Sequence, residues 1–114
     1  MRDERLYLDD ILQAAYLIRS FLSGASEDDW IDNEQLQSAV TYQLVVIGEA
    51  ANRVSAELRS RHPKIPWIDI VGFRNLAVHA YFAVNPNIVW TTARDDVPAL
   101  ATLVEQIIAN EFPA

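Results

Sequence analysis

An arginine, a histidine and a tyrosine lie within eight consecutive residues of the sequence, at Arg74, His79 and Tyr81. A guanidinium group offers a fixed fork of N–H donors to phosphate oxygens. An imidazole takes up or releases a proton near neutral pH. For any one of these residues alone, an ion pair or a packing role is the simpler explanation. Their combination indicates acid–base chemistry at a phosphate, and that chemistry needs no metal.

Helical geometry decides which of these side chains share a face. Asn75 and His79 are four residues apart and therefore neighbours, so the Asn75 amide can hold one imidazole nitrogen and fix the tautomer. Arg74 and His79, in contrast, diverge by about 140° on an ideal helix. They can meet at one phosphate only through the length of the Arg74 side chain, through a distorted helix or through a second subunit.

Glu49 lies in the apolar run of residues 47–51. A carboxylate in such surroundings must find a donor or change its pKa. We interpret it as half of a structural ion pair, with Arg74 or Asn75 among the groups that it can brace. His62 precedes a proline in a predicted loop and is a weak catalytic candidate. No metal-ligand spacing such as H-E-x-x-H and no glycine-rich phosphate loop is present, so no cofactor is expected.

The elements that must position these residues are all predicted to be helical. Apolar residues recur at spacings of three and four, the pattern of amphipathic helices, and there is no strand-like alternation. Ser26, with Asp29 three residues later, resembles a capping arrangement for a short turn that carries Trp30 and connects the first two helices. The predicted helices cover residues 8–22, 32 or 33 to about 60, 67–82, and 86 to the last apolar positions near 107.

Two glycines and one proline lie inside the predicted helices. Gly48 is expected where another helix approaches closely, because glycine otherwise costs helix stability. Gly72 is a candidate for an interruption of the third helix. Pro98 falls inside the last helix, yet the apolar spacing continues in phase across it, which favours a kink over two separate helices.

The composition fits a single domain covering residues 1–114. There is no cysteine, and hydrophobic residues make up 51% of the chain, which suggests a partner such as a second copy. The N-terminus lacks the apolar run of a signal peptide, and no segment approaches the roughly 18 apolar residues of a membrane span. We therefore expect a soluble, cytoplasmic protein without a membrane partner.

The net charge of −7 counts against a generally basic surface for nucleic acid. The charge is unevenly distributed, because residues 25–37 contain five acids and no base while residues 52–64 are mainly basic. Arg53, Arg59 and Arg61 are thus tentative contacts for an RNA backbone. A solvated helix end is the simpler explanation of the same cluster.

Several short motifs follow one another in a fixed order along nearly the whole chain. They are I-G-E-A-A at residues 47–51, H-P at 62–63, I-P-W at 65–67, R-N at 74–75, H-x-Y at 79–81, and Trp90. This ordered set resembles the HepT-like toxins of the HEPN superfamily. The resemblance implies an all-α, up-and-down four-helix bundle with short connecting helices, forming a homodimer or a higher even-numbered oligomer.

The resemblance assigns the R-x-x-x-x-H pair to Arg74 and His79 and places it at the dimer interface, with both copies facing one cleft. The implied reaction is metal-independent cleavage of RNA. His79 removes the proton of a ribose 2′-hydroxyl while Arg74 stabilises charge on the attacked phosphate, which leaves a 2′,3′-cyclic phosphate. Asn75 and Glu49 would support and orient the pair.

The resemblance also implies a partner, the minimal nucleotidyltransferase antitoxin of a type VII toxin–antitoxin system. This enzyme can attach AMP to the motif tyrosine, here Tyr81, and so introduce charge and bulk close to His79. Two alternatives remain open. One is a non-catalytic helical subunit that binds nucleotide or regulates a nucleotidyltransferase, and the other is a dimerisation module in which Arg74 and His79 only form interface hydrogen bonds.

Overall fold

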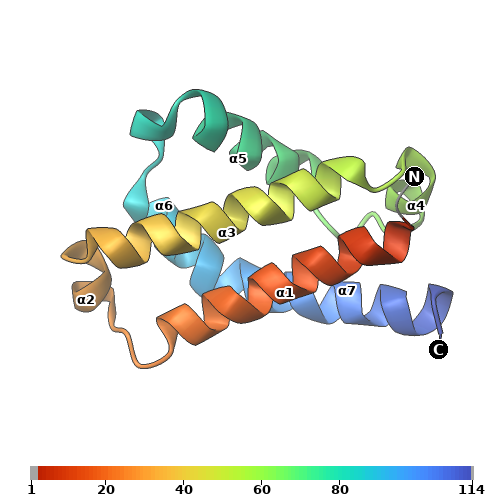
Figure 1. The fold of residues 1–114 in the computed structure, drawn as a ribbon, viewed down its shortest axis with the longest axis horizontal. Helices are drawn as coiled ribbons and strands as arrows, with labels where there is room; N and C mark the ends of the chain where they lie inside the picture. Colours follow the sequence, from red (N-terminus) through yellow and green to blue (C-terminus); the bar gives the residue numbers. More distant parts are fainter. Residues whose placement is uncertain (1–2, 114) are drawn as a thin grey trace.

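The computed structural model describes residues 3–113, and within this range the chain is helical, with no β-strand (Figure 1). The all-α prediction is therefore confirmed. No helix in this range is long and apolar enough to cross a bilayer. The helices are α1 (Glu4–Leu22), α2 (Glu27–Ile31), α3 (Glu34–Arg53), α4 (Ala56–Arg61), α5 (Trp67–His79), α6 (Pro86–Thr91) and α7 (Val97–Glu111).

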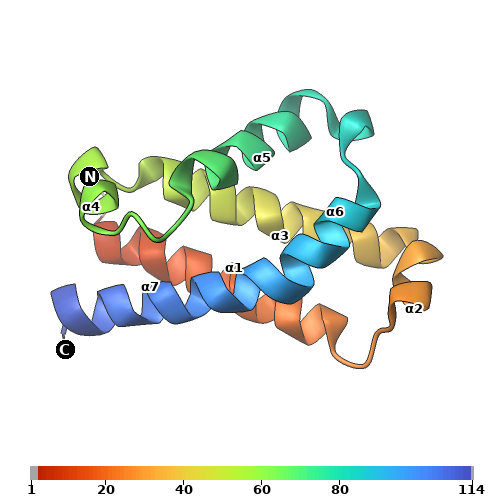
Figure 2. The same ribbon diagram turned by 180° about the vertical axis from the view of Figure 1, so that it is seen from behind.

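The four long helices alternate in direction along the longest axis of the molecule (Figures 1 and 2). These helices are arranged in a row in which each packs against the next. α5 packs against α3, α3 packs against α1, and α1 packs against α7. An apolar groove of about 420 Å³ remains between α5 and the α6–α7 arm. The closed four-helix bundle that the resemblance implies is thus not confirmed, although the four main helices are present.

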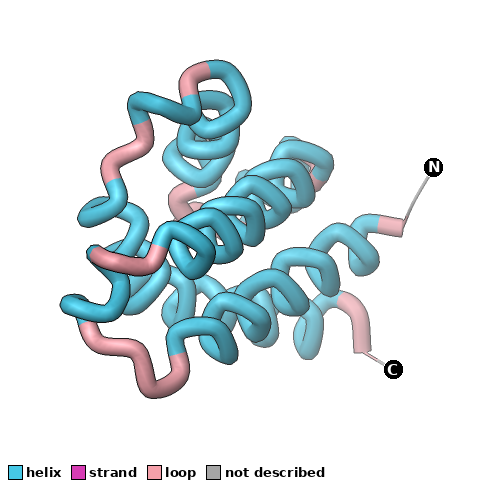
Figure 3. The backbone as a smooth tube through the Cα atoms, turned by 60° about the vertical axis from the view of Figure 1, so that its left-hand side comes forward, coloured by secondary structure: helices cyan, strands magenta, loops and turns pink. Residues whose placement is uncertain are grey.

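Short turns join the helices at both ends of the row (Figure 3). At one of them, Ser26 and Asp29 form the predicted capping box at the start of α2. This fixes Trp30, which is fully buried, and its indole N–H donates to the carbonyl of Pro86 at 2.9 Å. Its ring lies 5.6 Å from that of Trp90. The connector therefore locks α2 against α6.

The second helix is shorter than the apolar spacing predicted. α3 ends at Arg53, and a separate helix, α4, starts after Ser55. The Ser55 hydroxyl accepts from the Leu58 N–H at 3.1 Å, while its own N–H donates to Glu4 Oε1 at 2.6 Å. Because the Ser55 N–H donates to Glu4 of α1, it does not continue the backbone hydrogen bonds of α3. The prediction of one helix to about residue 60 was therefore wrong.

The third helix runs through Gly72 without interruption and ends at His79. Beyond it, Tyr81–Ala83 form a single 3₁₀ turn rather than the last residues of the helix. In the last helical arm, the bend expected at Pro98 takes the form of a π-helical turn over Thr92–Asp96 (Figure 2). A proline ring clashes with the carbonyl four residues earlier, and a wider turn relieves that clash.

Candidate active site on helix α5

Helices α3 and α5 touch where Gly48 faces Arg74. A Cβ atom built on Gly48 would lie only 2.3 Å from the Arg74 Cβ and 3.1 Å from the Ile70 carbonyl oxygen. Only glycine leaves room for the base of the arginine side chain at this point. The predicted role of Gly48 in a close helix approach is confirmed, and its neighbour on α5 is the motif arginine.

The guanidinium of Arg74 is held from two helices. Its Nη2 donates to Glu49 Oε1 at 2.8 Å, and its Nη1 donates to Asn75 Oδ1 at 2.9 Å. The ion pair predicted for Glu49 is thus formed, and its partner is Arg74. Both side chains are only partly exposed. A guanidinium has five N–H donors, so each terminal nitrogen keeps one for a ligand, while Nε is buried without a partner.

Asn75 orients Arg74 rather than His79. Its amide oxygen accepts from the guanidinium, and no hydrogen bond joins it to the His79 ring within residues 3–113, so the expected amide–imidazole contact is absent. A charged donor forms the stronger bond with an amide oxygen, which explains the preference. His79 is exposed at the end of α5, and its imidazole forms no hydrogen bond or ion pair in the described part.

The contact with Asn75 bears on the 140° separation of Arg74 and His79. Asn75 lies one turn before His79 on α5, and the guanidinium reaches Asn75. Within one protomer the guanidinium is thus held between Glu49 and Asn75. No direct hydrogen bond joins Arg74 to His79 among the described residues.

Two aromatic side chains follow His79 on the 3₁₀ turn. Tyr81 is 56% exposed. Phe82 is 92% exposed, and nothing in the sequence analysis singled it out. No sequence signal distinguished it, because Val78 stands four residues earlier and the third helix was predicted to run to residue 82.

The predicted basic cluster is divided by the fold. Arg53 is exposed and lies one helical turn after Glu49 on α3, so it is close to the arginine site. Arg59 and Arg61 belong to α4, which lies at the other end of the molecule from the C-terminal end of α5 (Figure 1). A continuous basic path from these three residues to His79 is therefore not formed within one protomer.

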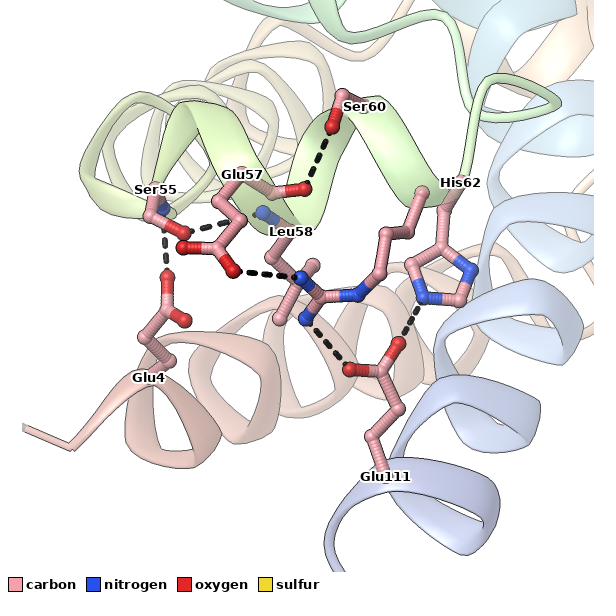
Figure 4. Close-up of polar contacts among 8 residues, drawn as sticks. Glu4, Ser55, Glu57, Leu58, Ser60, His62 and Glu111 are labelled. Carbon is pink, nitrogen blue, oxygen red and sulfur yellow. Dashed lines mark hydrogen bonds and ion pairs between the residues drawn. The ribbon is translucent and has the colours of Figure 1, made fainter.

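Arg61 and His62 belong to a tether between α4 and α7 (Figure 4). Arg61 Nη2 donates to Glu111 Oε1 at 2.6 Å, and the His62 ring contacts the other oxygen of the same carboxylate. The bond from Arg61, and then that from His62, lowers the pKa of Glu111. This position gives His62 a structural role. Within residues 3–113, no group of three His, Asp or Glu side chains could hold a metal ion.

Comparisons with known proteins show which family the chain belongs to. A family model described as ribonuclease HepT-like matches residues 11–107. A "Putative RNase" of Caldanaerobacter subterraneus subsp. tengcongensis is 35% identical over 97% of this chain and 99% of its own. A "Probable ribonuclease HepT" of Thermococcus cleftensis is 33% identical over 93% and 96%. No solved structure gave a significant match. The chain belongs to the HepT-like ribonuclease family.

Proposed function

We propose that the chain is an endoribonuclease that cleaves RNA without a metal, and that it is the toxin of a type VII toxin–antitoxin system. The observation that carries the proposal is that Glu49 and Asn75 hold the guanidinium of Arg74 on the helix that ends at His79, whose exposed imidazole forms no hydrogen bond within residues 3–113. Membership of a ribonuclease family supports the choice of RNA as substrate.

In the proposed reaction, the neutral imidazole of His79 removes the proton of a ribose 2′-hydroxyl. The 2′-oxygen attacks the adjacent phosphorus, and the remaining N–H groups of Arg74 donate to the oxygens on which negative charge grows. The bond to the 5′-oxygen of the next nucleotide breaks, and that oxygen leaves with a proton. The products are a 2′,3′-cyclic phosphate and a 5′-hydroxyl end.

A second copy would supply the acid for the leaving oxygen. α5 exposes the apolar side chains of Ile68, Leu76 and Val78 in a protomer that already has a complete core. Exposed apolar side chains of this kind favour association with another chain. In a homodimer formed through α5, the two motifs would face one cleft, and the partner subunit's His79, in its protonated form, would donate to the departing 5′-oxygen.

The antitoxin is proposed to act on Tyr81. A nucleotidyltransferase would join the Tyr81 oxygen to the α-phosphorus of ATP and release pyrophosphate. The exposure of Tyr81 supports this, and so does its position two residues after His79. The added phosphate would repel the RNA backbone, and the nucleotide would occupy the space in front of the imidazole.

Expression in a bacterial host tests the proposal as a whole. Wild-type protein should arrest growth, and Arg74→Ala and His79→Ala should each relieve the arrest at equal protein level. Arg5→Ala is the matched control, because Arg5 only forms a surface pair with Asp9 at 3.8 Å. Persistent arrest by both motif variants would reject this assignment of the active site.

Intact-mass measurement tests the modification separately. After incubation with the partner nucleotidyltransferase and ATP, wild-type protein should gain the mass of AMP and lose its ribonuclease activity. Tyr81→Phe should gain none. An unchanged wild-type mass, or the same gain on Tyr81→Phe, would rule out Tyr81 as the acceptor.

A further inference from the structure

Phe82 is held in solvent by an ordered turn. Its side chain is 92% exposed, although a phenylalanine is normally buried. The turn that carries it is closed by two hydrogen bonds, from the Ala83 N–H to the Ala80 carbonyl at 2.8 Å and from the Val84 N–H to the Tyr81 carbonyl at 3.0 Å. The ring is therefore presented by a fixed backbone and does not lie on a loose loop.

The turn also keeps Phe82 close to the proposed catalytic base. Phe82 is three positions after His79, and three residues of chain span at most about 10 Å. Stacked bases follow one another at about 3.4 Å per step. A base on the Phe82 ring would thus lie within roughly three nucleotides of a phosphate held at His79.

The charge of the protein favours a contact with RNA that does not depend on net positive charge. The net charge is −7, so attraction between the phosphate backbone and the whole surface is unfavourable. The Arg74 charge is shared with Glu49, and that of Arg61 with Glu111. Stacking on an aromatic ring supplies affinity without net charge, and it depends only weakly on which base is stacked.

We propose that Phe82, with Tyr81 beside it, is a stacking platform for an unpaired base next to the cleaved phosphate. The inference rests on the proposed ribonuclease function and specifies its substrate class as single-stranded RNA, including loops and ends. Bases inside a duplex are stacked on one another and cannot lie on an aromatic side chain in this way. The platform places the flanking base, while Arg74 and His79 act on the phosphate.

Binding in a His79→Ala background tests the platform without interference from cleavage. The probe is fluorescein-labelled oligo(A) of about ten nucleotides, compared with the same strand paired to oligo(U), and binding is followed by fluorescence anisotropy. The single strand should bind more tightly than the duplex. Adding Phe82→Ala should weaken single-strand binding roughly 5- to 100-fold, the range found for one base stacked on an aromatic ring.

Substitutions at Phe82 separate stacking from a simple apolar contact. Phe82→Trp should keep the affinity, whereas Phe82→Leu should lose as much as Phe82→Ala, because leucine is apolar but has no ring face. Ile31→Ala is the control for removing an exposed apolar side chain at a different helix. It should bind RNA as the His79→Ala parent does.

Three results would overturn the inference. These are equal RNA binding with and without Phe82→Ala, full affinity of Phe82→Leu, and loss of the dimer in Phe82→Ala by sedimentation, which would assign the ring to a protein interface. If the wild-type enzyme cleaves RNA and Phe82→Ala cleaves it equally well, the platform is wrong and the ribonuclease stands. If wild-type protein cleaves no RNA, the proposed function itself fails.

Discussion

Gly48 and Arg74 are in direct contact across helices α3 and α5, with no space for a methyl group between them. The next residue of α3, Glu49, binds the guanidinium at the other end of the same arginine. Two consecutive residues of α3 therefore contact both the Cβ atom and the guanidinium group of Arg74. The position of the proposed phosphate-binding group is thus set by packing between two helices and does not depend on α5 alone.

Gly48→Ala should displace Arg74. The added Cβ would meet the arginine Cβ at 2.3 Å, and because that atom is fixed to the backbone, the helices must move apart. Overpacking of this kind typically costs about 1–3 kcal/mol of unfolding free energy, and RNA cleavage should fall with it. Urea unfolding and a cleavage assay on the same preparation measure both effects.

Gly72→Ala is the matched control in the neighbouring helix. A Cβ at Gly72 has nothing within 4 Å, so the substitution should stabilise the protein by up to about 1 kcal/mol through helix propensity alone. Equal destabilisation by the two substitutions would show that the Gly48 contact is not special. A loss of stability in Gly72→Ala only would mean that the exposed face of α5 is covered in solution.

Glu49 should matter more for catalysis than for stability. The pair with Arg74 is partly exposed, so Glu49→Gln should change the unfolding free energy by less than about 1 kcal/mol. Glu49→Ala removes the acceptor altogether and leaves the guanidinium held by Asn75 alone. A misplaced catalytic group can cost on the order of 100-fold in rate, so cleavage should fall by about that factor.

Cleavage rates of wild-type and Glu49→Ala protein under single-turnover conditions check the predicted loss of activity. Glu57→Gln is the control, since Glu57 is an exposed carboxylate on α4 that contacts Arg61 at 3.5 Å. It should leave the rate unchanged. A Glu49→Ala enzyme with the wild-type rate would show that the ion pair only holds α3 and α5 together.

Much of the helical framework could be predicted from the sequence, because helices are marked by local signals. The spacing of apolar residues located α1, α3, α5 and the last arm, and the Ser26–Asp29 capping box marked α2. The close approach at Gly48 was also predictable, since an unfavourable glycine inside a long helix needs a packing reason. These features depend on residues only a few positions apart.

The rest depends on partners that are distant in the sequence. The break between α3 and α4 depends on the hydrogen bond from the Ser55 N–H to Glu4. The positions of Arg61 and His62 depend on their contacts with Glu111 at the end of α7. Arg74 packs against Gly48 and binds Glu49, which is 25 residues away in the sequence. No local pattern contains this information, so the expected contact between the Asn75 amide and the His79 imidazole is not formed among the described residues.

The Glu111 tether should make stability depend on pH. The pKa of Glu111 is lower in the folded protein because its carboxylate is bound first by Arg61 and then by His62. A lowered carboxyl pKa stabilises the fold above the unfolded value of 4.5, and the stabilisation is lost as the pH falls through the folded pKa. Glu111→Gln should therefore melt below wild type at neutral pH.

Thermal unfolding of both proteins over a series of pH values measures this difference. The gap between the two melting temperatures should narrow as the pH falls from 4.5 through the lower pKa of the folded protein, where the wild-type carboxylate also becomes neutral. A gap that stays constant, or that widens in acid, would contradict an ionic role for the tether.

Leu76→Glu should dissociate the proposed homodimer. Leu76 is 42% exposed on α5, so a carboxylate is tolerated in the protomer but would be buried, near its own symmetry copy, in an α5 interface. Sedimentation velocity should show a monomer with unchanged helical circular dichroism. Leu17→Glu is the control, because Leu17 is equally exposed on α1. Identical behaviour of the two variants would exclude α5 as the interface.

Cleavage of a single-stranded RNA in excess EDTA, with the product ends identified by mass spectrometry, tests the central claim most directly. Wild-type protein should produce 2′,3′-cyclic phosphate and 5′-hydroxyl ends, and Arg74→Ala and His79→Ala should each be slower by at least about 100-fold, a typical loss when one acid–base or charge-stabilising group is removed. Wild-type rates in both variants, or cleavage that stops in EDTA and leaves other ends, would contradict a metal-independent site built from Arg74 and His79.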